Sequence, residues 1–266
     1  MDDEFFGAPD KVALMRRAAA LWELLKEQPR YSFYGRMVAL SEPDEDAPAR
    51  LMNLARVQGA SVAYYYPKSG LDNLFAQYEA QGFAHDWWNH YRGGEAVLAA
   101  ARKILAEHAL PGDVTLVRID STTPADLVAK TAELCISCEV MAVPGSVMRG
   151  ISQPGITLVA LDRAGSPVAH AASYVIHHPE SVRASDAFWG MLATREDRRG
   201  QRIALVLGAH AIVHMWEREG IRGFMTGVRE GNISSSRLCN RLGVVDTEWA
   251  YAQCIDRAQL GGQLTK

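Results

Sequence analysis

Apolar residues recur along the chain at two spacings, one typical of amphipathic helices and one typical of half-buried strands. The helical spacing predicts helices at 9–28, 49–58, 71–81, 95–110, 125–140, 203–220 and 234–241. The alternating spacing predicts strands at 31–40, 60–66, 83–91, 114–119, 156–161, 168–176, 187–194, 223–228 and 245–253. We therefore expect an α/β (α+β) fold in which helices flank a central sheet.

The segments between these elements are rich in Gly, Pro and polar residues. The segment 41–48 is acidic and contains two prolines, so it predicts a surface loop. The segment 143–155 predicts a loop or short helix that forms a substrate wall. Asp162 to Gly165 predicts a tight turn between two strands. We expect the tail 261–264 to fray.

A turn at Leu110-Pro111-Gly112 marks the domain boundary that we expect. It divides the 266-residue chain into an N-terminal region, 1–112, and a C-terminal domain, 113–266. Each part is long enough to enclose a core of its own.

The run 192–205 carries the clearest chemical signal in the chain. It passes from an apolar strand through Arg and Gly residues into a helix that begins near Ile203. The first N–H groups of a helix have no intrahelical acceptor and lie at the positive end of its dipole. Arg198, Arg199 and Arg202 add charge to the same place. The run therefore predicts a site for a phosphate.

Composition excludes several other classes of function. Lysine and arginine number 28 against 31 aspartates and glutamates, so the net charge of −3 gives no general attraction to nucleic acid or to an anionic membrane. We expect neither partner. No apolar run reaches the length of a membrane span, and the acidic start lacks a secretory hydrophobic region. We expect a cytoplasmic protein.

The four cysteines are too few and too unevenly placed for a disulfide framework. The pair Cys135-x-x-Cys138 allows a metal or redox interpretation, but no second Cys/His pair follows at zinc-like spacing. Both residues fall on the apolar face of the predicted helix 125–140. We expect them to be buried and the protein to hold no metal.

Two motifs in the C-terminal half resemble those of the GNAT-type N-acetyltransferase superfamily. The run 199–204 is similar to its pyrophosphate loop, with Arg202 in place of the central Gly. The run 232–244 is similar to its second motif and keeps Asn232, Ser235 and Leu238, whereas Cys239 replaces a Tyr. In the N-terminal half, the order strand, helix, Gly82-Phe83, strand resembles the closing half of the same fold. We interpret that region as a degenerate half-repeat.

The resemblance implies a GNAT fold, with a mixed, mostly antiparallel central sheet flanked by helices. It also implies transfer of an acetyl group from acetyl-CoA directly to a primary amine. It implies that main-chain groups hold the pyrophosphate and the pantetheine arm. We expect Arg202 to adopt helical dihedrals and to point outward toward a phosphate. The residues expected to bind the cofactor are Leu192, Ala193, Thr194, Arg199, Gly200, Gln201, Arg202, Ile203, Ala204, Asn232 and Ser235. Capping of the helix that follows is an alternative role for Asn232.

The catalytic residues are less well defined by the sequence. We expect His170 or Glu139 to act as the general base, because their strand and helix positions flank the expected acceptor cleft. Cys239 stands where many members of the superfamily carry a proton-donating Tyr, and a packing role is its alternative.

Three functions compete at this point. The first is an N-acetyltransferase for a small molecule or peptide, and the second is a non-catalytic acyl-CoA-binding or regulatory module of the same fold. A nucleotide-binding protein is disfavoured because the loop lacks the Gly-Lys-Ser/Thr ending of a P-loop. We expect the N-terminal region to have one of two roles: it covers the acceptor cleft, or it forms a homodimer contact.

Overall fold

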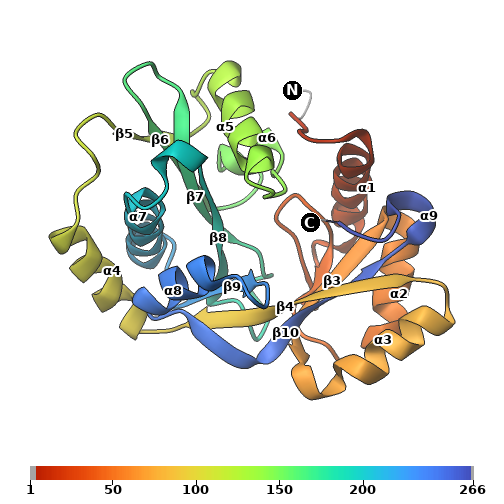
Figure 1. Ribbon diagram of the computed structural model, residues 1–266. Helices are drawn as coiled ribbons and strands as arrows, with labels where there is room; N and C mark the ends of the chain where they lie inside the picture. The colour runs from red at the N-terminus through yellow and green to blue at the C-terminus, as the bar shows by residue number, and fades with distance from the viewer. Residues whose placement is uncertain (1–3, 265–266) are drawn as a thin grey trace.

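The computed structural model describes residues 4–264, which form one ten-stranded sheet with helices on both faces (Figure 1). The helices are α1 (Pro9–Leu25), α2 (Ala47–Gln58), α3 (Leu71–Ala80), α4 (Ala96–Glu107), α5 (Ala125–Ser137), α6 (Gly145–Met148), α7 (Ile203–Arg218), α8 (Ile233–Arg241) and α9 (Arg257–Leu260). The strands are β1 (Tyr31–Ser32), β2 (Ala39–Leu40), β3 (Ala60–Pro67), β4 (Ala84–Gly93), β5 (Thr115–Ile119), β6 (Gly155–Leu161), β7 (Pro167–Val175), β8 (Asp186–Thr194), β9 (Gly223–Val228) and β10 (Val245–Ile255). These elements follow the predicted order, except that two short strands replace the single strand predicted at 31–40 and that α9 was not predicted.

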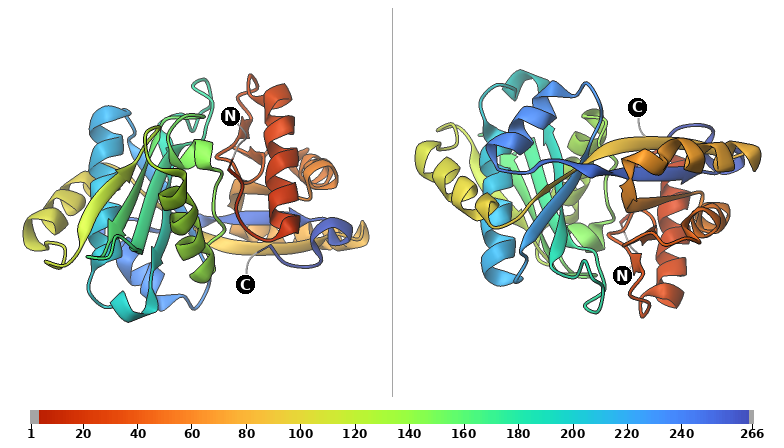
Figure 2. Two further views of the ribbon diagram at one scale, coloured as in Figure 1. Left: turned by 90° about the horizontal axis from the view of Figure 1, so that it is seen from above. Right: turned by 90° about the horizontal axis from the view of Figure 1, so that it is seen from below.

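The strands run in the order β1-β2-β3-β10-β4-β9-β8-β7-β6-β5. Among the strands in residues 4–264, only β2 with β3 and β8 with β9 are parallel, so the prediction of a mixed, mostly antiparallel sheet is confirmed. Helix α7 packs against β6, β7 and β8 on one face, and α5 packs against β7 and β8 on the other (Figure 2). Helices α1, α2 and α3 enclose a separate core with β3 and β10. Within residues 4–264, no helix combines the length and the apolar character needed to span a membrane.

The N-terminal and C-terminal halves of the chain repeat one arrangement of strands and helices. In the N-terminal half, α2 connects β2 to the parallel strand β3, and α3 then leads to β4. In the C-terminal half, α7 connects β8 to the parallel strand β9, and α8 then leads to β10. Each closing strand crosses to the other half, because β4 pairs with β9 and β10 pairs with β3. β4 and β10 also pair with each other at the centre. The sheet therefore runs without interruption across the boundary predicted at residue 112.

Two local expectations are wrong. The segment 31–40 is not one strand, because Gly35 adopts a positive φ of 92° and lies too close to Pro144 for a side chain there. The tail 261–264 does not fray, because α9 precedes it and Leu264, only 6% exposed, packs into the core. Both segments thereby line a cavity described below.

Candidate functional site

Strand β8 diverges from β9 after a short parallel contact, which opens the sheet at its centre. The two strands pair only from Asp186 to Phe188. Beyond that point β8 carries a bulge, since Ala172 pairs with Gly190 whereas His170 pairs with Ala193. A Cβ on Gly190 would lie 2.9 Å from Thr226 Oγ1, so glycine permits this close approach. The bulge removes Met191 and Leu192 from regular ladder pairing.

The first of two cavities at this opening is formed by the start of α7, the end of β8 and one side of α8. We call it the arginine cavity, and its volume is about 520 Å³. It is lined by Cys138, Leu192, Thr194, Arg198, Arg199, Gly200, Arg202, Ile203, Ala204, Leu205, Asn232, Ser234, Ser235, Arg237, Leu238 and Arg241. The first main-chain bond of α7 runs from Val206 N–H to the Arg202 carbonyl (3.1 Å). The N–H groups that precede it, at the mouth of the cavity, remain for a ligand.

Most of the charge in the arginine cavity is uncompensated. Arg198 pairs with both carboxylate oxygens of Asp113, at 2.8 and 3.0 Å. Arg202 and Arg241 face the two ring nitrogens of His108 at 3.4 and 3.0 Å. Within residues 4–264, Arg199, Arg202, Arg237 and Arg241 form no ion pair with a carboxylate. The cavity therefore favours an anion with more than one charge.

Nine of the eleven residues that the sequence assigns to cofactor binding line this cavity. The two exceptions are Ala193, which is buried in the core, and Gln201, which points to solvent. Sequence reasoning missed Arg237 and Arg241, although their spacing of four residues places them on one face of α8. Asn232 accepts a hydrogen bond from Ser235 N–H (3.1 Å), so it caps α8 while it lines the cavity. Cys138 is only partly buried and donates to the Thr194 carbonyl.

The dihedral angles expected for Arg202 are wrong. Arg202 is left-handed, with φ 62° and ψ 14°, and forms the N-cap of α7. A non-glycine residue in this region is strained by contact between its Cβ and the backbone. The exposed side chain of Arg202 reaches toward His108 rather than into the turn.

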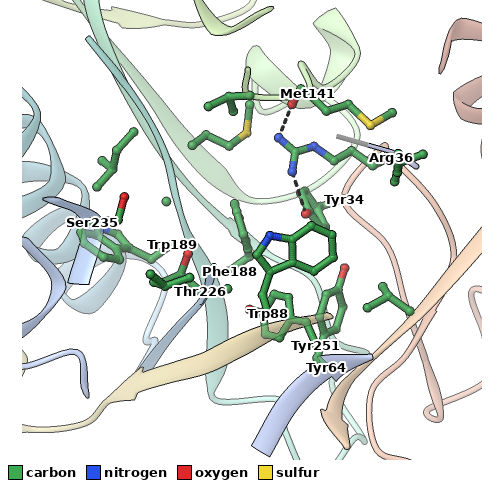
Figure 3. A pocket seen from close by; sticks show the side chains of 18 of the residues that line it. Tyr34, Arg36, Tyr64, Trp88, Met141, Phe188, Trp189, Thr226, Ser235 and Tyr251 are labelled. Atoms are coloured by element: carbon green, nitrogen blue, oxygen red, sulfur yellow. Dashed lines mark hydrogen bonds between the residues drawn. The ribbon is translucent and has the colours of Figure 1, made fainter. Parts of the chain in front are cut away.

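The second cavity lies on the other side of the bulge, where the two halves of the sheet meet. We call it the aromatic cavity, because Tyr34, Tyr64, Trp88, Phe188 and Tyr251 line it (Figure 3). Its volume is about 240 Å³. It shares Leu192, Asn232 and Ser235 with the arginine cavity. The two cavities therefore adjoin at these residues, beside the bulge of β8.

Of the three residues proposed for catalysis, Cys239 and Glu139 line the aromatic cavity and His170 does not. His170 is fully buried and lines neither cavity, and its Nδ1 lies 2.8 Å from the Met191 carbonyl. Burial lowers the pKa of His170 to about 4. Cys239 lines the aromatic cavity and is 2% exposed, and burial raises the pKa of its thiol to about 12. Glu139 lies at the rim of the same cavity, exposed and with a positive φ of 62°.

Comparison with known proteins identifies the architecture. The model of the acetyltransferase (GNAT) family matches residues 143–244, which include the bulged β8, the loop before α7 and α8. This part of the chain is a GNAT-family domain. No curated protein matches the sequence.

Solved structures extend the GNAT likeness over almost the whole chain. A GCN5-related N-acetyltransferase from Kribbella flavida superposes with a TM-score of 0.55 at 15% identity, covering 91% of this chain and 95% of that one. A GCN5-related N-acetyltransferase-like protein from Streptococcus suis gives 0.53 at 18% identity, covering 92% and 99%. A tandem GNAT protein from the clavulanic acid biosynthesis pathway gives 0.53 at 14% identity, covering 82% and 74%. At these identities the likeness establishes the fold, and the family supports an acyltransferase function.

Proposed function

We propose that the protein is an N-acetyltransferase that moves an acetyl group from acetyl-CoA to the primary amine of a small molecule. The observation that carries this proposal is the junction of the arginine and aromatic cavities at the bulged edge of β8, where they share Leu192, Asn232 and Ser235. One cavity is suited to phosphates and the other to an organic acceptor. Their shared edge is where the two substrates meet.

The arginine cavity supplies two kinds of donor for the phosphates of CoA. The N–H groups at the start of α7 suit the pyrophosphate, since they point along the helix axis and add the effect of the dipole. The guanidinium groups of Arg237 and Arg241 on α8 suit a further phosphate, because neither group is neutralised by a carboxylate within residues 4–264.

The bulge of β8 suits the thioester. Leu192 lies in the bulge, where it has no paired residue on β7, and it lines both cavities. We therefore assign its N–H as the donor to the thioester oxygen. A fixed main-chain donor at that point stabilises the negative charge that develops when the amine attacks. His170 holds the carbonyl of the neighbouring Met191 and thereby fixes the bulge. We assign to His170 a positioning role in place of the role of general base.

Proton transfer does not require Cys239. A thiol with a pKa of about 12 stays protonated at neutral pH, and it is a weaker acid than the thiol that leaves. Glu139 at the rim remains available as a base, directly or through water. Positioning of the two substrates then supplies most of the rate enhancement.

Only the C-terminal half of the repeat is equipped to bind the cofactor. In the N-terminal half, α2 occupies the place that α7 holds in the C-terminal half. The loop before α2 carries Glu42, Asp44, Glu45 and Asp46 instead of arginines. Carboxylates at a helix N-terminus interact favourably with the positive end of the helix dipole, and they repel a phosphate. We propose that this half is a degenerate repeat that contributes acceptor-binding residues.

Calorimetric titration with acetyl-CoA, CoA and ATP tests the donor site. We expect micromolar binding of acetyl-CoA that is lost in the variant Arg199→Glu/Gly200→Glu. The matched control is Arg163→Glu/Ala164→Glu, which makes the same change of charge in the exposed β6–β7 turn and lines neither cavity. A wild-type protein that does not bind acetyl-CoA would contradict the proposal.

A panel of amines, with thiol release and product mass as readouts, then tests transfer. Binding of acetyl-CoA without transfer to any amine would favour the alternative function, a non-catalytic acyl-CoA-binding module. The replacement of the family Tyr by the buried Cys239 is the observation that supports this alternative.

A further inference from the structure

The walls of the aromatic cavity are preorganised by contacts among the rings themselves. The rings of Tyr34 and Phe188 stack with centroids 4.6 Å apart, and Tyr64 and Tyr251 meet edge to face at 4.8 Å. Tyr34 and Tyr64 come from the N-terminal half, whereas Phe188 and Tyr251 lie on β8 and β10. The cavity thus draws its aromatic walls from both halves of the sheet, and these rings suit a flat apolar group.

Besides neutral polar side chains such as Thr226, Asn232 and Gln253, the lining of this cavity includes one cationic side chain. Arg36 lies on the segment between β1 and β2 and is half-buried. Its guanidinium donates to the Met141 carbonyl and to the Tyr34 hydroxyl (3.2 Å), and it lies over the Tyr34 ring at 5.3 Å (Figure 3). Its Nε is buried and has no hydrogen-bond partner. These contacts fix the position of the charge but do not neutralise it.

The charge of Arg36 has no counter-ion among the residues that the structure describes. Within residues 4–264, no carboxylate lies within ion-pair distance of Arg36, whereas Arg92, Arg149, Arg195, Arg198 and Arg229 each pair with at least one. A partly buried cation without a counter-ion is costly, and an anionic ligand relieves that cost. The other charged residue of the cavity, Glu139, is exposed at the rim, where solvent screens it.

We infer that the acceptor is a primary amine that also carries a carboxylate and a flat apolar body, as an aromatic amino acid does. The inference rests on the proposed function, because it concerns the second substrate of that reaction. The carboxylate binds Arg36, and the apolar body lies between the aromatic rings. The amine lies toward Ser235, which stands on the other side of Trp88 from Arg36 in Figure 3. This arrangement directs the amine to the edge of β8 shared with the arginine cavity.

Binding of small probes tests the inference without acetyl-CoA. The probes are 3-phenylpropionate, its neutral amide and 3-phenylpropylamine, titrated by calorimetry into the full-length protein. We expect the carboxylate to bind at least about tenfold more tightly than the amide, since a charge-assisted hydrogen bond to a guanidinium is stronger than one between neutral groups. We expect the amine to bind most weakly, because Arg36 repels it. Equal affinities of the carboxylate and the amide for the wild type would overturn the inference.

Substitution of Arg36 assigns the preference to this residue. In Arg36→Gln we expect the carboxylate and the amide to bind equally, and in Arg36→Lys we expect part of the preference to remain. The matched control is Arg56→Gln, because Arg56 also lies over an aromatic ring, that of Phe83 at 5.0 Å, but lines neither cavity. A preference that survives in Arg36→Gln would overturn the inference. The wild-type comparison decides the matter if the Arg36 variants do not fold.

Turnover separates this inference from the proposed function. With acetyl-CoA present, we expect kcat/KM for phenylalanine to exceed that for 2-phenylethylamine by at least about tenfold. A failure of acetyl-CoA to bind refutes the proposed function and leaves the probe affinities to decide the nature of the ligand. Efficient acetylation of 2-phenylethylamine, with no gain from the carboxylate, refutes the inference and leaves the enzyme function standing.

Discussion

His170 and Met191 form a link that fixes the opening of the sheet. The Nδ1 atom of His170 on β7 lies 2.8 Å from the carbonyl oxygen of Met191 on β8. Met191 has a positive φ of 52°, a strained value for a methionine, and the bond satisfies its carbonyl where the ladder is interrupted. The histidine therefore stabilises the backbone geometry that exposes Leu192 to both cavities.

The first prediction concerns the pH dependence of stability. Unfolded His170 titrates near its ordinary pKa of about 6.5, whereas burial lowers the pKa in the folded protein to about 4. Between these two pKa values the unfolded state binds a proton that the folded state does not. The contribution of His170 to the free energy of unfolding is therefore complete above pH 6.5 and declines as the pH falls from there toward 4. We expect His170 alone to account for a loss of about 2 kcal/mol in the free energy of unfolding between pH 7 and pH 5.

The variant His170→Asn tests this prediction, because the asparagine amide can still donate to the Met191 carbonyl but does not titrate. We expect urea unfolding of this variant to lose about 2 kcal/mol less than the wild type over the same pH interval. His170→Leu serves as the comparison that removes both the charge and the bond. Equal pH dependence in the wild type and in His170→Asn would show that His170 does not carry the effect.

The second prediction concerns Cys239. Its buried thiol, with a pKa of about 12, is neither a nucleophile nor an effective acid at neutral pH. We expect Cys239→Ala to retain turnover within about threefold while it loses about 1 kcal/mol of stability through the small cavity that it creates. Steady-state kinetics and urea unfolding measure the two effects. A fall in kcat of two orders of magnitude at unchanged KM would restore a catalytic role to the thiol.

The sequence predicts the elements because each is encoded locally. Gly82, just after α3, has a positive φ of 80°, and Gly165, in the turn after Asp162, has a φ of 77°. Glycine is the residue type that favours such values. The residues of the arginine cavity follow from one continuous strand, turn and helix, together with the helix that starts at Asn232. Most residues that line the arginine cavity could therefore be predicted, whereas Arg237 and Arg241 were missed.

The aromatic cavity could not be predicted in the same way. It depends on pairing between strands more than 100 residues apart, as in the contact of β4 with β9, and periodicity contains no information on such pairing. Alternation along β7 places His170 on one face of the strand. It does not show that this side chain contacts the Met191 carbonyl in the bulge of β8. Arg36 lies in a segment that the pattern predicts as a strand, and Gly35 interrupts that strand.

The third prediction concerns Arg202 at the start of α7. Glycine adopts its left-handed conformation without strain, whereas alanine keeps the strain, and both remove the charge. We therefore expect Arg202→Gly to be about 1 kcal/mol more stable than Arg202→Ala, measured by urea unfolding. We expect both to bind acetyl-CoA more weakly than the wild type by the same factor. Unequal affinities would show that the backbone of residue 202, rather than its charge, contacts the ligand.

The last prediction concerns Asp186, which joins the two halves of the sheet. Its carboxylate is 1% exposed and accepts two hydrogen bonds from Arg92 on β4, at 2.7 and 2.8 Å, and one from the hydroxyl of Tyr65 on β3 at 2.6 Å. Burial by itself would raise the pKa of Asp186, but these hydrogen bonds and the charge of Arg92 hold it below its ordinary value.

Removing one partner of this pair leaves the other charge without compensation. We expect Asp186→Asn to lose about 2 kcal/mol in the free energy of unfolding, because the Arg92 side chain left behind is 37% exposed and solvent partly screens its charge. We expect Asp186→Asn/Arg92→Met to recover part of that loss, because no unpaired charge then remains. The control is Glu217→Gln, which breaks the exposed pair with Arg102 and costs at most about 1 kcal/mol. Additive losses in the double variant would show that Asp186 and Arg92 act independently and do not join the two halves.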